Sequence, residues 1–175
     1  MAKIIGMVGR NAAAKDWKSF AGLARRLPQI EAWGVGVSME EAAALDKDFA
    51  CVKWKGFQSD GRAWIRKLDL FVLTSKHEEM PTVVLECFAE RTPICGFIPA
   101  GGMQEILSLS DGPLKDVFIE ERDIDKLADI VRRIISDDDL RDSLVEDGWQ
   151  ILANHFDAEK NCREQLMDIY RRVLA

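Results

Sequence analysis

The chain has 175 residues, of which 30 are acidic and 24 basic, so its net charge is −6 at pH 7. This acidic balance argues against broad binding to nucleic acid or an anionic membrane, although it leaves room for a local basic pocket. The length suits one ordinary domain. The four cysteines show no CxxC spacing, which favours buried, reduced thiols in a cytoplasmic protein over zinc ligands or disulfides. We find neither a signal-peptide pattern nor an apolar run near the ~20 residues of a membrane span.

Strand patterns and amphipathic helical patterns alternate along the first two thirds of the chain. We predict strands over residues 3–9, 31–37, 51–55, 70–74, 93–98 and 116–120, and helices over residues 15–27 and 61–67, from Pro81, and after Gly101-Gly102. Residues 39–45 are predicted to be helical or irregular. This alternation predicts an α/β fold, a Rossmann-like parallel sheet with helices on both faces, over residues 1–120 of a single domain. Ligands of such sheets bind beyond the carboxyl ends of the strands.

Residues 121–175 are interpreted as a helical tail. Asp123 is placed to cap a helix over residues 124–135, and Ser136 with Asp139 resembles a capping box for residues 140–153. Asp157 is placed to cap a last helix. That helix carries one apolar stripe, made of Cys162, Leu166, Ile169, Tyr170 and Val173.

The segment of residues 75–89 carries the most informative pattern. Glu86 lies in a helical run that is otherwise apolar on every face, which is typical of a buried helix. A carboxylate there needs a basic partner, for which Arg10 and Lys15 are the candidates, or a polar ligand. Pro81 suits the first position of this helix, and the free amides behind it would face the loop of Glu78 as an anion site. Such a pocket suits a ligand with a phosphate end and a hydroxyl-rich end, such as a sugar nucleotide.

The first strand ends at Gly9, which allows a tight turn, and is followed by Arg10 and Lys15. An arginine and a lysine in this position suit phosphate binding. Taken alone, this motif favours the other interpretation, that both are solvated surface cations.

Two further strands end in weaker signals. The paired glycines Gly101 and Gly102 would let backbone amides approach a ligand, or would form an ordinary turn. Phe57 would stack beside a base or belong to the core. His77, beside the first glutamate, is interpreted as an incidental surface residue.

Taken in order, these segments resemble the C-terminal, donor-binding half of the GT-B fold glycosyltransferases of family 4. Four motifs of that family occur with matching spacing as far as about residue 110. The matching residues are Gly9, Arg10 and Lys15 of a G-R-x4-K loop; Ser75, Glu78, Pro81 and Glu86 of an S-x-x-E-G-x-P-x4-E segment; Pro93 of a G-x-P turn; and Gly101, Gly102 and Glu105 of a G-G-x-x-E loop.

The resemblance implies a retaining glycosyltransferase of polysaccharide or lipopolysaccharide assembly. It implies a nucleotide-sugar donor, with a UDP-sugar favoured over a GDP- or ADP-sugar, and no cofactor or metal. Arg10 and Lys15 would hold the diphosphate and, with Glu78, act in catalysis, while Glu78 would contact the sugar and Glu86 the ribose. The remaining donor-binding residues that it implies are Gly9, Phe57, Met80, Pro81, Thr82, Val83, Gly101, Gly102 and Glu105, the last as a support of the glycine loop.

The chain departs from the family pattern at three glycines, which are replaced by Asp16, Glu79 and Arg91. Glu79 adds charge beside the expected sugar site. Enzymes of this family also carry a preceding acceptor-binding domain. We therefore expect this chain to be one half of an enzyme that is cytoplasmic and peripheral at the inner membrane, and to bind a donor without transferring its sugar.

Two other functions remain open from the sequence. A sugar-nucleotide epimerase shares the fold but fits the spacing of Glu78 and Glu86 less well. A non-catalytic signalling or nucleotide-binding module is the alternative of another class. A receiver-like module would need an acidic cluster after its first strand, where this chain has Arg10 and Lys15.

Overall fold

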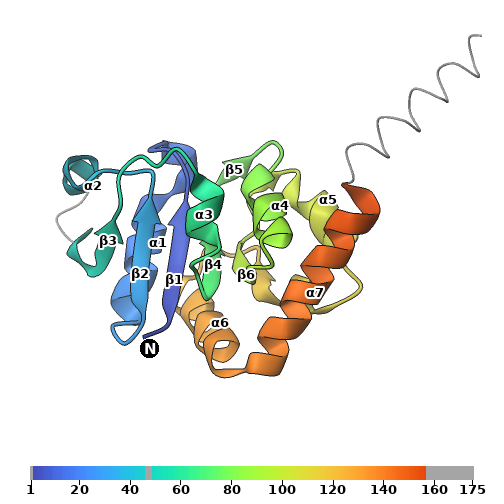
Figure 1. The fold of residues 1–175 in the computed structure, drawn as a ribbon. Helices are drawn as coiled ribbons and strands as arrows, with labels where there is room; N and C mark the ends of the chain where they lie inside the picture. Colours follow the sequence, from blue (N-terminus) through green and yellow to red (C-terminus); the bar gives the residue numbers. More distant parts are fainter. Residues whose placement is uncertain (1, 46–48, 157–175) are drawn as a thin grey trace, which may run out of the picture.

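The computed structural model describes residues 2–45 and 49–156, with a six-stranded parallel sheet at its centre (Figure 1). The strands are β1 (Ile4–Val8), β2 (Glu31–Val35), β3 (Val52–Trp54), β4 (Leu70–Leu73), β6 (Ile94–Phe97) and β8 (Phe118–Ile119), in the order β3-β2-β1-β4-β6-β8. The chain first builds the sheet outward from β1 to β3 and then returns to add β4 on the other side of β1. A crevice opens at such a reversal, between the carboxyl ends of the strands.

Helices cover both faces of the sheet (Figure 1). They are α1 (Trp17–Arg26), α2 (Met39–Leu45), α3 (Gly61–Ile65), α4 (Thr82–Ala89), α5 (Met103–Ser108), α6 (Ile124–Ser136) and α7 (Asp138–His155). Helix α1 packs beside α6, and α4 packs against α3 and α7. Every residue of β4 and β6 is buried between these layers, as expected for central parallel strands. None of the helices in the described ranges has the length and apolar character needed to cross a bilayer.

The predicted strands and helices up to residue 155 are confirmed, with ends that shift by a few residues. The apolar face predicted for the first helix is also confirmed, because Trp17, Phe20, Leu23 and Leu27 are all buried. The predicted last helix, with its cap Asp157 and its apolar stripe, lies outside the described residues.

Two details of helix termini were predicted wrongly. Pro81 is the N-cap of α4 rather than its first residue, with φ −76° and ψ 73°. The capping box at Ser136 does not form, because Ser136 is the last residue of α6. Asp137 caps α7 instead, and its carboxylate accepts a hydrogen bond from the amide of Leu140 at 2.9 Å. A carboxylate accepts this bond one residue later than the sequence pattern indicated.

A small second sheet was not predicted from the sequence. Strand β5 (His77–Glu78) pairs in parallel with β7 (Ala100–Gly101) just beyond the carboxyl edge of the main sheet. Two-residue strands have no periodicity from which they could be predicted. This pairing joins two of the segments that carry candidate site residues.

Two of the cysteines behave as predicted. Cys87 and Cys95 are buried free thiols. Burial raises the pKa of both, and the neighbouring carboxylate of Glu86 raises that of Cys87 further. Both thiols are therefore protonated and unreactive at neutral pH. Cys51, by contrast, is exposed.

Two of the three replaced glycines lie where the backbone has a positive φ. Asp16 and Arg91 both have φ 52°, and among the described residues other than glycine no other has a positive φ. A side chain in this region costs about 1–2 kcal/mol, least for Asp and Asn. Arg91 recovers part of this cost by stacking on the ring of Trp149, 4.6 Å from its centroid. The carboxylate of Asp16 accepts a hydrogen bond from the Ser19 hydroxyl at 2.7 Å.

The cap of α7 leads to a first prediction. Asp137→Ala should lower the free energy of unfolding by about 1 kcal/mol, because the amide of Leu140 loses its acceptor. The matched variant Ser136→Ala should change it by less than about 0.5 kcal/mol, as a surface substitution does. Urea unfolding followed by circular dichroism measures both. A larger loss for Ser136→Ala than for Asp137→Ala would contradict the observed cap.

The environment of Asp16 leads to a second prediction, on pH. Burial raises the pKa of Asp16, but hydrogen bonds from Ser19 and Arg122 and the charges of Arg122 and Lys76 outweigh it and hold the pKa below its ordinary value of 3.8. The carboxylate therefore stabilises the fold above pH 3.8, and this contribution is lost as the pH falls through the folded-state pKa. Asp16→Asn keeps a side chain that tolerates positive φ but removes the charge.

We expect the wild-type chain to have a higher free energy of unfolding than Asp16→Asn near pH 6, and the difference to close as the pH falls below 3.8 and through the folded-state pKa of Asp16. Urea unfolding at a series of pH values measures the difference. The exposed Asp142 offers a control, because Asp142→Asn should leave the pH profile close to that of the wild type. If the difference in free energy of unfolding between the wild type and Asp16→Asn stayed constant down to the lowest pH at which both chains fold, the stabilising role of the Asp16 carboxylate would be refuted.

Candidate functional site

A pocket of about 540 Å³ lies at the carboxyl edge of the sheet, where the order of the strands reverses. One wall is the loop that follows β1, and the other is the segment from His77 to the first turns of α4. We call it the edge pocket. Eight of the predicted site residues line it: Gly9, Arg10, Lys15, Glu78, Met80, Thr82, Val83 and Glu86.

An ion pair crosses the edge pocket. The ammonium of Lys15 lies 2.5 Å from a carboxylate oxygen of Glu78, and the two side chains are only 19% and 12% exposed. The stem of Lys15 packs on Gly9, where a Cβ would come within 3.3 Å of Lys15 Cε. Shielding from water makes this pair stronger than an exposed one. The loop after β1 and the segment after β4 are thus joined by opposite charges.

Glu86 lies in the same pocket without a basic partner. It is half-buried, and no lysine, arginine or histidine within residues 2–45 and 49–156 forms an ion pair with it. The alternative that Glu86 is paired with Arg10 or Lys15 is therefore wrong, since Lys15 is taken by Glu78. Of the two explanations for a carboxylate at Glu86, a basic partner or a polar ligand, the polar ligand therefore fits the structure better.

Arg10 stands at the mouth of the edge pocket. The residue is exposed, and its carbonyl accepts a hydrogen bond from the indole N–H of Trp17 at 3.2 Å. Its guanidinium makes no ion pair with any described residue, so it is available to a ligand. The pocket thus combines one available cation, one cation shared with Glu78 and, in Glu86, a half-buried carboxylate that forms no ion pair with the described residues.

The start of α4 is a weaker anion site than the sequence predicted. The amide of Thr82 donates to the Met80 carbonyl at 2.8 Å, and the amide of Val84 donates to the Pro81 carbonyl at 2.8 Å. Of the amides of Thr82, Val83 and Val84, only that of Val83 has no backbone acceptor in the described part of the chain. These three residues therefore offer one free amide rather than a row of them.

The paired glycines fix the position of Glu78 rather than line the edge pocket. Gly101 has φ 114°, and a Cβ at this residue would lie 2.0 Å from the Glu78 carbonyl oxygen. The amide of Gly102 donates to the carbonyls of Glu78 and Glu79, both at 3.1 Å. A larger residue at either glycine would push this strand pair apart. The predicted contact of these glycines with a ligand stays a prediction.

Three other predicted residues lie outside the lining of the edge pocket. Phe57 is 85% exposed after β3, so its interpretation as a core residue is wrong. Pro81 is buried beneath the start of α4. Glu105 is exposed in the first turn of α5, and its carboxylate makes no hydrogen bond or ion pair with the described residues, so no support of the glycine loop is seen.

Glu79 lies beside Glu78, as the sequence indicated, whereas His77 was interpreted as an incidental surface residue. Both are exposed and both line the edge pocket. Glu79 therefore adds a third carboxylate to a pocket that holds two cations. The pairing of β5 with β7, which carries this segment, was the missing signal.

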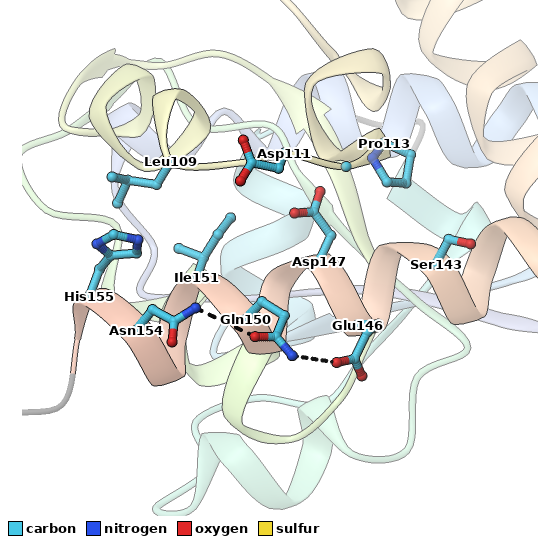
Figure 2. Close-up of a pocket in the computed structure, with 11 residues that line it drawn as sticks. Leu109, Asp111, Pro113, Ser143, Glu146, Asp147, Gln150, Ile151, Asn154 and His155 are labelled. Carbon is cyan, nitrogen blue, oxygen red and sulfur yellow. Dashed lines mark hydrogen bonds between the residues drawn. The ribbon is translucent and has the colours of Figure 1, made fainter.

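A second cavity, of about 480 Å³, lies between α7 and the loop of residues 109–113 (Figure 2). Among the described residues its wall carries the carboxylates of Asp111, Glu146 and Asp147 and no lysine or arginine. Asp147 points from α7 toward the loop (Figure 2) and accepts a hydrogen bond from the Ser110 hydroxyl at 2.7 Å. This carboxylate ties the loop to the helix. With three carboxylates and no lysine or arginine among its described lining residues, the cavity suits an anion poorly. The edge pocket is therefore the candidate site.

The fold is shared with solved structures, one of them compared over about half of its chain and one over a single domain. The Anabaena protein HepE, solved with UDP and glucose, superposes with a TM-score of 0.80 at 19% identity, over 97% of this chain and 48% of that one. The C-terminal domain of the group 1 glycosyl transferase LpcC from Francisella tularensis superposes with a TM-score of 0.72 at 22% identity, over 89% of this chain and 87% of that one.

Sequence similarity points the same way. The lipopolysaccharide core biosynthesis glycosyltransferase LpsE of Rhizobium meliloti (strain 1021) is 27% identical over 179 residues, which cover 99% of this chain and 50% of the relative. The chain thus spans about half the length of this curated relative. Residues 2–137 match the family described as glycosyl transferases group 1. Because this match covers most of the chain, the protein belongs to the group 1 glycosyl transferase family.

Proposed function

We propose that this chain is the nucleotide-sugar-binding half of a retaining glycosyltransferase that acts in polysaccharide or lipopolysaccharide assembly. A UDP-sugar is the favoured donor, and no metal is required for its binding. The role of the similar protein LpsE in lipopolysaccharide core biosynthesis supports the pathway. The HepE structures with UDP, with UDP and glucose, and with UDP-glucose support the class of donor.

The observation that carries the proposal is the distribution of charge in the edge pocket. Arg10 and Lys15 stand on the wall formed by the loop after β1, and Glu86 stands on the opposite wall in α4. A nucleoside diphosphate has matching parts, because its phosphates need cations and its ribose hydroxyls can donate to a carboxylate. The volume of about 540 Å³ is also in the range of small-molecule pockets.

In the proposed reaction the bond between the donor sugar and the diphosphate breaks, and negative charge develops on the leaving nucleotide. Arg10 and Lys15 stabilise this charge, as fixed cations do in a partly dehydrated site. Glu78 contacts the sugar hydroxyls, and Glu86 accepts from the ribose. The described residues thus supply binding and charge stabilisation, while an acceptor-binding domain outside this chain supplies the acceptor, at the membrane surface.

The first test is binding of UDP to the chain in the presence of EDTA, measured by calorimetry. Separate titrations with GDP and ADP show which nucleoside diphosphate binds most tightly. Arg10→Ala should cost about 1.5–3 kcal/mol of binding free energy, as loss of a charge-assisted hydrogen bond does. Lys115→Ala, an exposed cation outside the pocket, should leave the affinity unchanged. If the double variant Arg10→Ala/Lys15→Ala bound UDP as tightly as the wild type, the pocket assignment would be wrong.

Because Lys15 forms an ion pair with Glu78, the proposal predicts opposite changes of UDP affinity for two glutamate variants. Glu78→Gln keeps the shape and frees the ammonium of Lys15, so UDP without a sugar should bind a few-fold more tightly. Glu86→Gln is the same change of charge on the opposite wall, where no cation is released. It should instead weaken UDP binding by about 1 kcal/mol, because a ribose hydroxyl loses a charged acceptor.

Calorimetry on the two glutamine variants, with thermal unfolding as a check of folding, measures these opposite effects. Equal losses of affinity in both variants would mean that Glu78 contacts the nucleotide itself. Unchanged affinity in Glu86→Gln would remove the assigned role in ribose binding.

A further inference from the structure

Arg122, in the loop between β8 and α6, reaches into the edge of the sheet behind the edge pocket. Its guanidinium donates to the Thr74 carbonyl at 2.6 Å and to the Ser75 carbonyl at 3.1 Å. It also pairs with the carboxylate of Asp16 at 2.5 Å and lies 4.5 Å from the ring centroid of Phe97. One side chain thus bridges the turn after β4 and the residue that directly follows Lys15.

The loop that ends in Lys15 is also hydrogen-bonded to the residues that directly follow β4. The amide of Lys76 donates to the Ala14 carbonyl at 2.6 Å, and the Thr74 hydroxyl lies 3.2 Å from the carbonyls of Lys15 and Asp16. Thr74 and Ser75 are fully buried. Their carbonyls therefore need hydrogen-bond donors, and the guanidinium of Arg122 provides one donor to each carbonyl.

Asp16 connects this bridge to the pocket. Its side chain is only 9% exposed, and its backbone is held at a positive φ of 52°. The residue has no freedom to shift without breaking its contacts with Ser19 and Arg122. Because Lys15 precedes Asp16 directly, the position of the Lys15 backbone follows that of Asp16.

We propose that Arg122 is a positioning residue of the edge pocket, which holds Lys15 in place for an anionic ligand through Asp16 and the turn after β4. The inference rests on the proposed function, because UDP serves as the probe. Arg122 does not line the pocket, so its effect on a ligand passes through Lys15. If the contacts of Arg122 served only stability, their loss would lower the free energy of unfolding without changing UDP affinity.

The experiment is UDP binding to the full chain by calorimetry, at a temperature at which thermal unfolding shows every variant to be folded. Arg122→Ala should weaken UDP binding about tenfold, which corresponds to about 1.4 kcal/mol. In a Lys15→Ala background the same substitution should change the affinity by less than about twofold, because residues that act through one another are not additive. Arg122→Lys should fall between, since an ammonium can keep the pair with Asp16 but cannot reach both carbonyls.

Arg26 offers a matched control. It forms a forked ion pair with Asp125 that also ties α1 to α6, but it does not line the edge pocket. Arg26→Ala should lower the melting temperature and leave UDP affinity unchanged. Asp16→Asn, which keeps the backbone geometry and loses the charge, should weaken UDP binding in the same direction as Arg122→Ala, and it serves if Arg122→Ala does not fold.

Two outcomes would overturn the inference alone. One is unchanged UDP affinity in Arg122→Ala and Asp16→Asn while the wild type binds, and the other is a tenfold loss that persists in the Lys15→Ala background. Failure of the wild-type chain to bind UDP, GDP or ADP would overturn both the proposed function and this inference.

Discussion

Strand β1 pairs in parallel with β4, with Ile5 opposite Leu70 and Gly6 opposite Phe71, and this pairing brings the two walls of the edge pocket together. Parallel strands place their carboxyl ends at one edge, so the loop with Lys15 and the segment with Glu78 must meet there. The segment that leads into β4 packs closely on β1, since a Cβ on Gly6 would lie 2.5 Å from the side chain of Leu68. The site is therefore a consequence of strand order, and the side chains then decide what it can bind.

The charges of the edge pocket are arranged unevenly. Lys15 and Glu78 neutralise each other across the pocket, whereas Arg10 and Glu86 have no charged partner among the described residues. A half-buried carboxylate without a basic partner among the described residues can accept hydrogen bonds from a polar ligand. Such uncompensated groups are typical of binding sites, because their partner is the ligand. An anion with hydroxyl groups would satisfy both, which is why the proposed donor fits the pocket better than a purely apolar ligand.

Two of the departures from the family pattern share a structural explanation. Asp16 and Arg91 replace glycines at positive φ, and each makes contacts that a glycine could not make. Arg91 stacks on Trp149, and Asp16 pairs with Arg122 and Lys76. The strain at each position is thus offset by an interaction of its own side chain. At Asp16 that interaction lies directly beside Lys15, so the departure affects the candidate site as well as stability.

Local patterns were sufficient for the parallel α/β fold, the loop cations and both glutamates, because strand and helix periodicity and residue spacing are properties of the chain itself. They were insufficient for three features: the partner of Lys15, the function of Gly101 and Gly102 as spacers for the β5–β7 pair, and the bridge made by Arg122. Each depends on a contact between residues far apart in sequence, such as Lys15 with Glu78 or Arg122 with Asp16. Sequence spacing fixes which residues share an edge of the sheet, but only the packed backbone sets the distances that decide which charge meets which.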